Sequence, residues 1–218
     1  MKKKFCPIVS LFSILFIQSP LFSQSFTLLK DINPGSNGSS YFNFTNVNGV
    51  LFFRPDDGVH GDELWKTDGT PAGTVMVKDI FPGNSGSELD LLTNVNGLLF
   101  FRADNGVNGT ELWKSDGTAA GTVMVKDIYP GAATSSPTSF YNANGLLYFN
   151  ATNGVNGREL WKSDGTATGT VMVKDIFPGV YTSGLGAGTP NSGNPQNFML
   201  VNGVVFFIGA DDYYKSEL

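Results

Sequence analysis

The chain has 218 residues, with 14 lysines and arginines against 19 aspartates and glutamates, and a formal net charge of −5 at pH 7. A net negative chain is a poor partner for nucleic acid or for an anionic membrane, and this length fits one domain of ordinary size. The single cysteine, Cys6, lies near the start. The rest of the chain can therefore form neither a disulfide nor a thiolate site.

The first 23 residues have the pattern of a secretory leader. Three lysines at positions 2–4 precede an apolar run over 8–17, and small residues follow around Ser23. This order is typical of a signal peptide, and the run is too short to span a bilayer. We predict a signal peptide over 1–23 and a secreted repeat domain over 24–218, without membrane insertion. Removing three of the 14 basic residues leaves 11 against 19 acidic ones, a net charge of about −8.

A repeat with a step of 48 residues follows the leader. The tripeptide KDI begins at Lys30, Lys78, Lys126 and Lys174, and ELW begins at Glu63, Glu111 and Glu159. In the fourth copy, a ten-residue insertion lies in the Gly- and Pro-rich segment after Gly179. A fixed step of this size indicates a repeat architecture. The predicted units cover about 33–80, 81–128, 129–176 and, incompletely, 177–218.

The sequence of each unit predicts four short strands. We describe them in chain order for the second unit. A strand over 91–95 meets the turn Asn96-Gly97, a strong hairpin signal, and a second strand covers 98–103. A polar loop leads to a third strand over 111–115. The segment DGTAAGT then turns the chain into a fourth strand, which starts at residue 123. Frequent Gly and Pro exclude long helices.

The apolar pattern predicts that both faces of each sheet are buried. Four consecutive apolar residues at 98–101 place large side chains on both faces of one strand. Small sheets covered on both faces by similar sheets are the blades of a β-propeller. We predict an all-β propeller of 48-residue, four-stranded blades. Three blades are complete, and either the N-terminal strand FTLLKDI completes a fourth or the chain is part of a larger propeller.

The segment ELWKSDGT at 111–118 resembles the signature of the ELWxxDGT repeat proteins. The match recurs from Glu63 and from Glu159 and stops at Glu217-Leu218. The resemblance covers essentially all of the chain after the leader. It implies a secreted or surface protein of a bacterium, and it implies no reaction and no cofactor.

The repeated polar and aromatic residues have structural interpretations. Asp68, Asp116 and Asp164 fit turns in which the carboxylate accepts backbone N–H groups. The strand tryptophans fit packing between blades: Trp65, Trp113 and Trp161. The loops that begin DDGVHGDE and DNGVNGTE offer carboxylates to calcium, but their spacing differs from that of a calcium loop. We therefore predict no metal site.

The variable connections predict where a ligand binds. In a propeller, the connections after the second and fourth strands share one face, and binding usually resides in variable loops on a rigid scaffold. This face carries residues near 33–40, 81–90, 129–139 and 177–197. Three tyrosines that break the repeat pattern in or beside it are the predicted contacts: Tyr181, Tyr213 and Tyr214.

We expect a non-catalytic module that binds a glycan or a protein. The chain has one histidine, His60, and nearly all its carboxylates recur in every unit, whereas chemistry at one centre requires one differentiated set of groups. Asp211 and Asp212 are a carboxylate pair outside the pattern, but adjacent strand residues diverge. Two alternatives are a glycan-active hydrolase or lyase on a propeller scaffold and a structural fragment of a longer surface protein.

Overall fold

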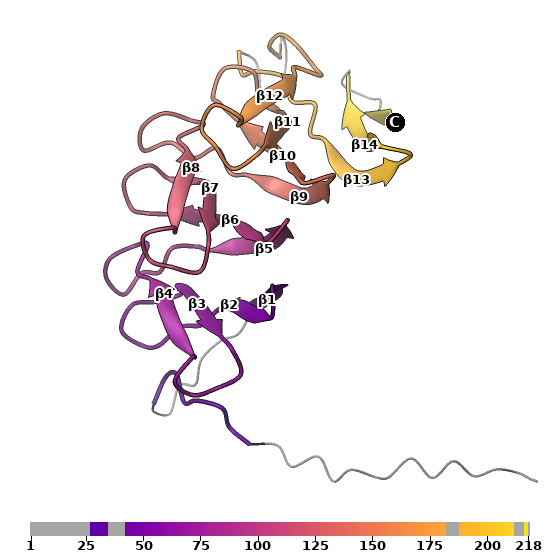
Figure 1. Cartoon of the computed structure of the whole chain (residues 1–218). Helices are drawn as coiled ribbons and strands as arrows, with labels where there is room; N and C mark the ends of the chain where they lie inside the picture. Colours follow the sequence, from indigo (N-terminus) through magenta and orange to yellow (C-terminus); the bar gives the residue numbers. More distant parts are fainter. Residues whose placement is uncertain (1–26, 35–41, 182–187, 212–215, 218) are drawn as a thin grey trace, which may run out of the picture.

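The computed structural model describes residues 27–34, 42–181, 188–211 and 216–217. Within these ranges the chain forms antiparallel sheets and no helix. The sheets follow one another along an open arc (Figure 1), in the order of the sequence repeats. The predicted leader over 1–23 lies outside the described residues.

Three sheets have four strands and the last has three. The first contains β1 (Phe42–Val47), β2 (Val50–Arg54), β3 (Leu64–Thr67) and β4 (Val75–Lys78). The second contains β5 (Asp90–Val95), β6 (Leu98–Asp104), β7 (Thr110–Ser115) and β8 (Val123–Lys126). The third contains β9 (Thr138–Ala143), β10 (Leu146–Thr152), β11 (Arg158–Ser163) and β12 (Val171–Lys174). The fourth contains β13 (Gln196–Val201), β14 (Val204–Ala210) and β15 (Ser216–Glu217).

Each strand pairs with the next one in the chain, so every sheet is a simple up-and-down meander. The first strands, β1, β5, β9 and β13, line the inner side of the arc (Figure 1). The predicted Asn-Gly turns join first and second strands, with positive φ at both residues: 52° at Asn96 and 84° at Gly97. This is the conformation that a two-residue hairpin turn requires. The prediction of four-stranded antiparallel units is thus confirmed.

The first strand of each unit carries a bulge that the sequence pattern does not predict. In the first unit the pairing of β1 with β2 shifts between Phe42 and Thr45. The same irregularity recurs with a positive φ in every unit, at Asn43, Leu91, Ser139 and Asn197. Left-handed backbone is costly for leucine. Its recurrence shows that the bulge belongs to the repeat.

Neighbouring sheets bury each other's apolar faces. Val95, Phe100 and Leu112 of the second sheet pack with residues of the third in one core cluster, which adds Leu147, Phe149 and Trp161. The corresponding residues of the first and second sheets form an equivalent cluster. Burying one large apolar side chain contributes about 1.5–3 kcal/mol. The stacked sheets therefore stabilise each other, and the fold is propeller-like.

A lysine and a tryptophan join the first sheet to the second and the second sheet to the third. Lys78, at the end of β4, donates a hydrogen bond to the carbonyl of Thr122 at 2.7 Å, and its Nζ lies 5.9 Å from the centroid of the Trp113 ring. Lys126 contacts Thr170 and Trp161 in the same way. The tryptophans are buried between sheets, as predicted. Each contact combines a cation–π interaction with a hydrogen bond from a charged donor.

The DGTxxGT turns are built around the aspartate side chain. Asp116 Oδ1 accepts the backbone N–H of Thr118 at 2.8 Å and its hydroxyl at 2.7 Å, which confirms the predicted turn role. These hydrogen bonds, first of all from the Thr118 side chain, lower the pKa of Asp116. A Cβ on Gly121 would lie 2.1 Å from this carboxylate. The second glycine of the turn therefore leaves the space that the carboxylate fills.

The two ends of the arc differ from its middle. Residues 27–34 pack on the outer face of the first sheet, where Lys30 contacts the Thr74 carbonyl and the Trp65 ring. These contacts are the ones that Lys78 makes to the second sheet, so this segment lies as a preceding fourth strand would. The fourth sheet ends with β15. Within the part of the chain that the structure describes, no helix is long and apolar enough to cross a membrane.

Candidate ligand-binding face

The variable connections lie against the loops between second and third strands, as predicted, and together they form one face. Ser87, in the connection from β4 to β5, donates its backbone N–H to the Asp62 carbonyl at 3.0 Å. Ser136 bonds to Thr110 in the same way, and Asn194 bonds to Arg158. These repeated bonds hold each variable connection against the loop beside it. We call this surface the loop face.

A buried glutamate anchors the loops of each unit. Glu111, the first residue of the ELW motif, accepts the backbone N–H groups of Ile128 at 3.0 Å and Ser135 at 3.0 Å. The Ser135 hydroxyl adds a 2.6 Å hydrogen bond. Glu63 accepts from Ile80 and Phe81, and Glu159 accepts from Ile176 and Gly193. The motif glutamate thus binds the start of the connection to the next sheet, a role that the sequence pattern does not reveal.

Burial governs the protonation of these glutamates. It raises the pKa of Glu63 to about 7, although hydrogen bonds from Ile80 and Phe81 oppose the shift. The pKa values of Glu111 and Glu159 are raised for the same first cause. All three side chains are fully buried. They serve the scaffold and cannot contact a ligand on the loop face.

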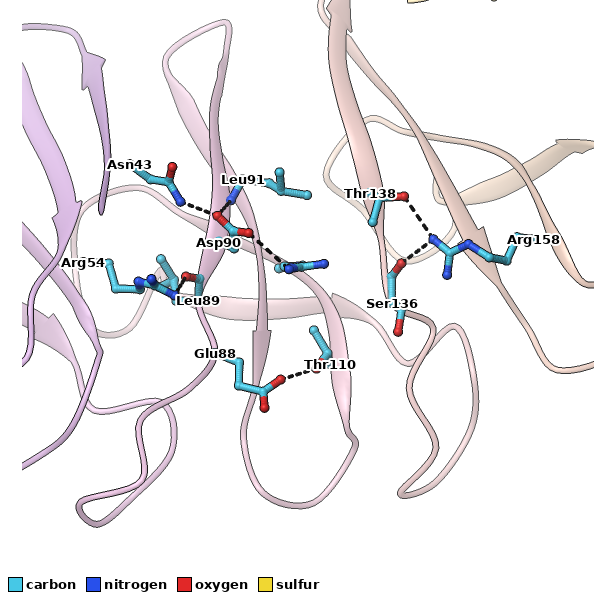
Figure 2. Close-up of polar contacts among 11 residues, drawn as sticks. Asn43, Arg54, Glu88, Leu89, Asp90, Leu91, Thr110, Ser136, Thr138 and Arg158 are labelled. Atoms are coloured by element: carbon cyan, nitrogen blue, oxygen red, sulfur yellow. Dashed lines mark hydrogen bonds and ion pairs between the residues drawn. The ribbon is translucent and has the colours of Figure 1, made fainter. Parts of the chain in front are cut away.

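A polar cluster lies where the loop face meets the inner strands (Figure 2). At its centre, Asp90 forms a 3.1 Å ion pair with Arg102. The Asp90 carboxylate also accepts the side-chain amide of Asn43, from the first sheet, and the backbone N–H of Leu91 at 2.8 Å. Three donors therefore fix this carboxylate, which in turn orients the Arg102 guanidinium.

Two further arginines extend the cluster to the neighbouring sheets. Arg54, at the end of β2, donates to the Leu89 carbonyl at 2.8 Å. Arg158, at the start of β11, donates to the Ser136 carbonyl at 2.7 Å and to the Thr138 hydroxyl at 3.0 Å. The chain has three arginines, and each of them bonds to a residue of this cluster; Figure 2 labels Arg54 and Arg158. We call them the arginine row.

The arginine row concentrates positive charge on an acidic chain. Burial, and then the nearby charge of Arg102, lower the pKa of Arg158, but a guanidinium remains charged at neutral pH. The Arg102 side chain is 29 % exposed, whereas its Nε is buried without a hydrogen-bond partner and cannot reach a ligand in solvent. A guanidinium binds carboxylate or sulfate groups through paired N–H donors. The row can therefore bind an anionic ligand that runs across several sheets.

Sequence reasoning missed the arginine row, although a signal was present. Arg54 and Arg102 occupy one repeat position, where the third unit has Asn150. Arg158 replaces Thr110 of the second unit and Asp62 of the first. The signal is thus a difference between copies at single residues near strand ends, outside the variable connections.

The predicted tyrosines lie elsewhere or are not described. Tyr181 stands in the connection from β12 to β13, where its ring meets Phe177 edge to face at 6.4 Å. Its backbone N–H donates to the Thr189 carbonyl at 2.9 Å. Tyr181 therefore belongs to the connection between the third and fourth sheets, whose Asn194 bonds to the backbone carbonyl of Arg158. Tyr213 and Tyr214 lie outside the described residues, and a contact role for the three tyrosines stays a prediction.

The acidic loops use their carboxylates to hold turns. Asp57 accepts the backbone N–H groups of Val59 and His60, and its second oxygen lies 2.7 Å from His60 Nδ1. This hydrogen bond raises the pKa of His60. Asp104 accepts from Gly106 in the second unit. Among the described residues, no three His, Cys, Asp or Glu side chains are grouped as a metal ion would require.

Comparison with known proteins gives no family and no function. No family model matches the chain, and no curated protein matches it. Three solved structures are similar at 13–15 % identity: the computationally designed Ika8 protein (TM-score 0.43), a prolyl endopeptidase (0.44) and an engineered GH43 glycoside hydrolase (0.32). In the same order, the matches cover 82 %, 82 % and 84 % of this chain. They cover 45 %, 25 % and 38 % of the three solved chains. The chain thus spans less than half of each.

Proposed function

We propose that this protein is a secreted or cell-surface bacterial module of the ELWxxDGT repeat type that binds a ligand without catalysis. The loop face is the binding surface, and a glycan that carries carboxylate or sulfate groups is the ligand. A protein ligand with an acidic segment is the second class. Nucleic acid is disfavoured by the net negative charge of the chain.

The observation that carries this proposal is the position of the arginine row. Three sheets contribute one arginine each, and each arginine bonds to a residue at the start of an inner strand or in the connection before it: Leu89, Asp90 and Ser136. Five repeated lysines serve contacts inside the fold instead, because Lys30, Lys66, Lys78, Lys114 and Lys126 each donate to a backbone carbonyl. Arg54 and Arg158 also donate to backbone carbonyls, whereas Arg102 pairs with the Asp90 carboxylate and its side chain is 29 % exposed. Arg102 is thus the cation of the row that carries the proposed contact with a ligand.

The hydrogen bonding of the carboxylates supports a non-catalytic role. The ELW glutamates are buried against backbone N–H groups, and the DGT aspartates are fixed within turns. Asp90, the carboxylate at the centre of the arginine row, is fixed by three donors. A general acid or base needs a group that can exchange a proton with the substrate, and these carboxylates are committed to the scaffold.

The proposal also concerns whether the four sheets close into a ring of their own or form part of a larger propeller. A ring of four blades requires residues 27–32 to complete the fourth sheet of the same chain. The open arc in Figure 1 favours the alternative, in which the four sheets are part of a larger propeller. In that arrangement the four sheets are either a binding module themselves or a structural section of a longer surface protein.

Isothermal titration tests the ligand class. Oligogalacturonate and neutral oligomers of the same length are titrated into the protein, with Arg102→Gln as the test variant. Losing a charged hydrogen-bond donor costs about 1.5–3 kcal/mol, so we expect binding of the anionic glycan to weaken at least about tenfold. Lys174→Gln removes one exposed positive charge from β12 and should leave affinity unchanged.

Three results would contradict the proposal. Equal binding of neutral and anionic oligomers would show that the arginine row does not select the ligand. An equal loss of affinity in Arg102→Gln and Lys174→Gln would show that binding depends only on the net charge of the protein. The appearance of new reducing ends or unsaturated products during incubation would show that the protein is an enzyme.

A further inference from the structure

The outer face of the fourth sheet is apolar and uncovered. Val201 is 43 % exposed and Phe206 is 40 % exposed, whereas Val47 and Phe52, at the same repeat positions of the first sheet, are 6 % and 3 % exposed. Val204 is also exposed. In the first and second sheets this face is covered by the next sheet along the chain. The fourth sheet thus presents one half of an interface that the molecule already contains.

The first sheet presents the other half of that interface. Phe44 is 59 % exposed, whereas Leu92, its counterpart in the second sheet, is buried. It borders an apolar hollow of about 270 Å³ that is also lined by Leu28, Leu29, Leu51 and Phe53. No side chain of another sheet fills this hollow among the described residues.

The turn glycines show that the first sheet has no aromatic ring from a preceding sheet packed against it in the described residues. A Cβ on Gly117 would lie 3.2 Å from the Phe52 ring of the preceding sheet, and one on Gly165 would lie 3.1 Å from Phe100. At Gly69, the equivalent residue of the first sheet, nothing lies within 4 Å. By the repeat, the ring that belongs there is that of Phe206, because Phe206 occupies the repeat position of Phe52 and Phe100.

The strands at the two ends are complementary as well. Among the described residues, the fourth sheet has three strands, and no strand lies outside β15. Residues 27–32 already lie on the first sheet as the outermost strand of a preceding sheet, with Lys30 in the position of Lys78. One end of the chain therefore carries the strand that the described part of the other end lacks.

We propose that two copies of this chain associate head to tail, with the outer face of the fourth sheet of each copy packed on the first sheet of the other. Residues 27–32 of one copy lie beside β15 of its partner. Unlike halves of an interface generate a ring when the rotation closes. Two arcs of four sheets make a ring of eight, within the usual range for propellers.

The open arc favours a second copy over closure within one chain. Figure 1 places the indigo N-terminal segment and the yellow fourth sheet at opposite ends of the arc. No pairing joins the fourth sheet to the first in the described residues. Since the head-to-tail contact continues the existing stacking, it keeps the loop faces of both copies on the same side of the ring.

The molar mass in solution tests this proposal. The full-length sequence is expressed, the mass of the recovered chain is determined by mass spectrometry, and the mass in solution is measured by light scattering. We expect twice the mass of the recovered chain. Val204→Glu and Phe44→Glu, one at each half of the interface, should each return the mass of a single chain. Val155→Glu, at an exposed loop valine between β10 and β11, is the matched control and should remain a dimer.

Cysteine cross-linking tests the head-to-tail geometry without relying on variants that weaken the interface. In a Cys6→Ser background, Phe44→Cys and Val204→Cys are prepared separately, then mixed, unfolded and refolded together. A cross-link of two chains that forms only in the mixture supports the proposal. Cross-linking of either variant alone, a ladder of larger products, or a wild-type chain with the mass of a monomer would overturn it.

Discussion

Glu111 accepts the backbone N–H of Ile128 at 3.0 Å, so a residue at the start of one strand fixes the chain after the next strand has ended. The same bond joins Glu63 to Ile80 and Glu159 to Ile176. Each carboxylate is buried, and burial raises its pKa. The first three units therefore each depend on an acid that is held away from water.

These glutamates make the stability of the protein depend on pH. The pKa of Glu63 in the folded chain is about 7, above its ordinary value of 4.5, so the folded state binds more protons than the unfolded state between these values. The contribution is complete below pH 4.5 and is lost as the pH rises through 7. We expect urea unfolding at pH 4.5–8 to show this decline. The decline should be smaller in Glu63→Gln, whereas the exposed control Glu88→Gln should retain the wild-type slope. A Glu63→Gln slope equal to that of the wild type would contradict the assignment.

A methyl group at Gly121 should destabilise the turn of the second unit. Its Cβ would lie 2.1 Å from the Asp116 carboxylate, so Gly121→Ala must displace that side chain and break its bonds to Thr118. We expect a loss of about 1–3 kcal/mol in the free energy of unfolding. Gly209→Ala is the control, because the second and third units carry Ala103 and Ala151 at this position. Equal effects of the two substitutions in chemical denaturation would refute the explanation.

The lysine contacts between sheets should contribute only where a following sheet supplies the partners. Lys126 donates to the Thr170 carbonyl and lies over the Trp161 ring. Lys174 occupies the same repeat position but is exposed. We expect Lys126→Met to cost about 1–3 kcal/mol and Lys174→Met to have almost no effect. Thermal and urea unfolding measure both, and a similar cost for each would show that the contact does not couple the sheets.

The predicted leader has a direct test in the N-terminus of the exported protein. Expression of all 218 residues in a bacterium that carries out secretion should yield a chain that starts near Gln24, because positions 1–23 have the order of a signal peptide. Mass spectrometry of the culture medium and of the cell surface measures this. An intact N-terminus on a protein retained in the cytoplasm would contradict the prediction.

Much of the fold could be predicted because its determinants are local and recur every 48 residues. The turn at Asn96-Gly97, the apolar run of β6 and the turn at Asp116 each depend on a few neighbouring residues. The bulge at Leu91 could not be predicted, because no residue there favours a positive φ. In the structure, the backbone N–H of Leu91 bonds to the Asp90 carboxylate, which also accepts the side-chain amide of Asn43 from the first sheet.

The site was predictable as a face but not as a set of residues. The loop face can be predicted because loops alternate between the two faces of a propeller. The arginine row cannot, because it depends on the distances between strand ends in adjacent sheets. Arg102 meets Asp90 across the pairing of β5 with β6, and Arg158 meets Ser136 across a loop. Neither distance follows from the sequence. The role of Glu111 was missed for the same reason, because its partners follow 17–24 residues later.

Unfolding of Phe100→Ala tests most directly whether each sheet is stabilised by the next. Phe100 is almost fully buried, packs in the cluster shared with the third sheet, and lies close to Gly165. We expect its removal to lower the free energy of unfolding by about 3–5 kcal/mol, while Val107→Ala, at an exposed loop position, changes it by less than about 0.5 kcal/mol. A Phe100→Ala variant as stable as Val107→Ala would show that the sheets do not bury one another.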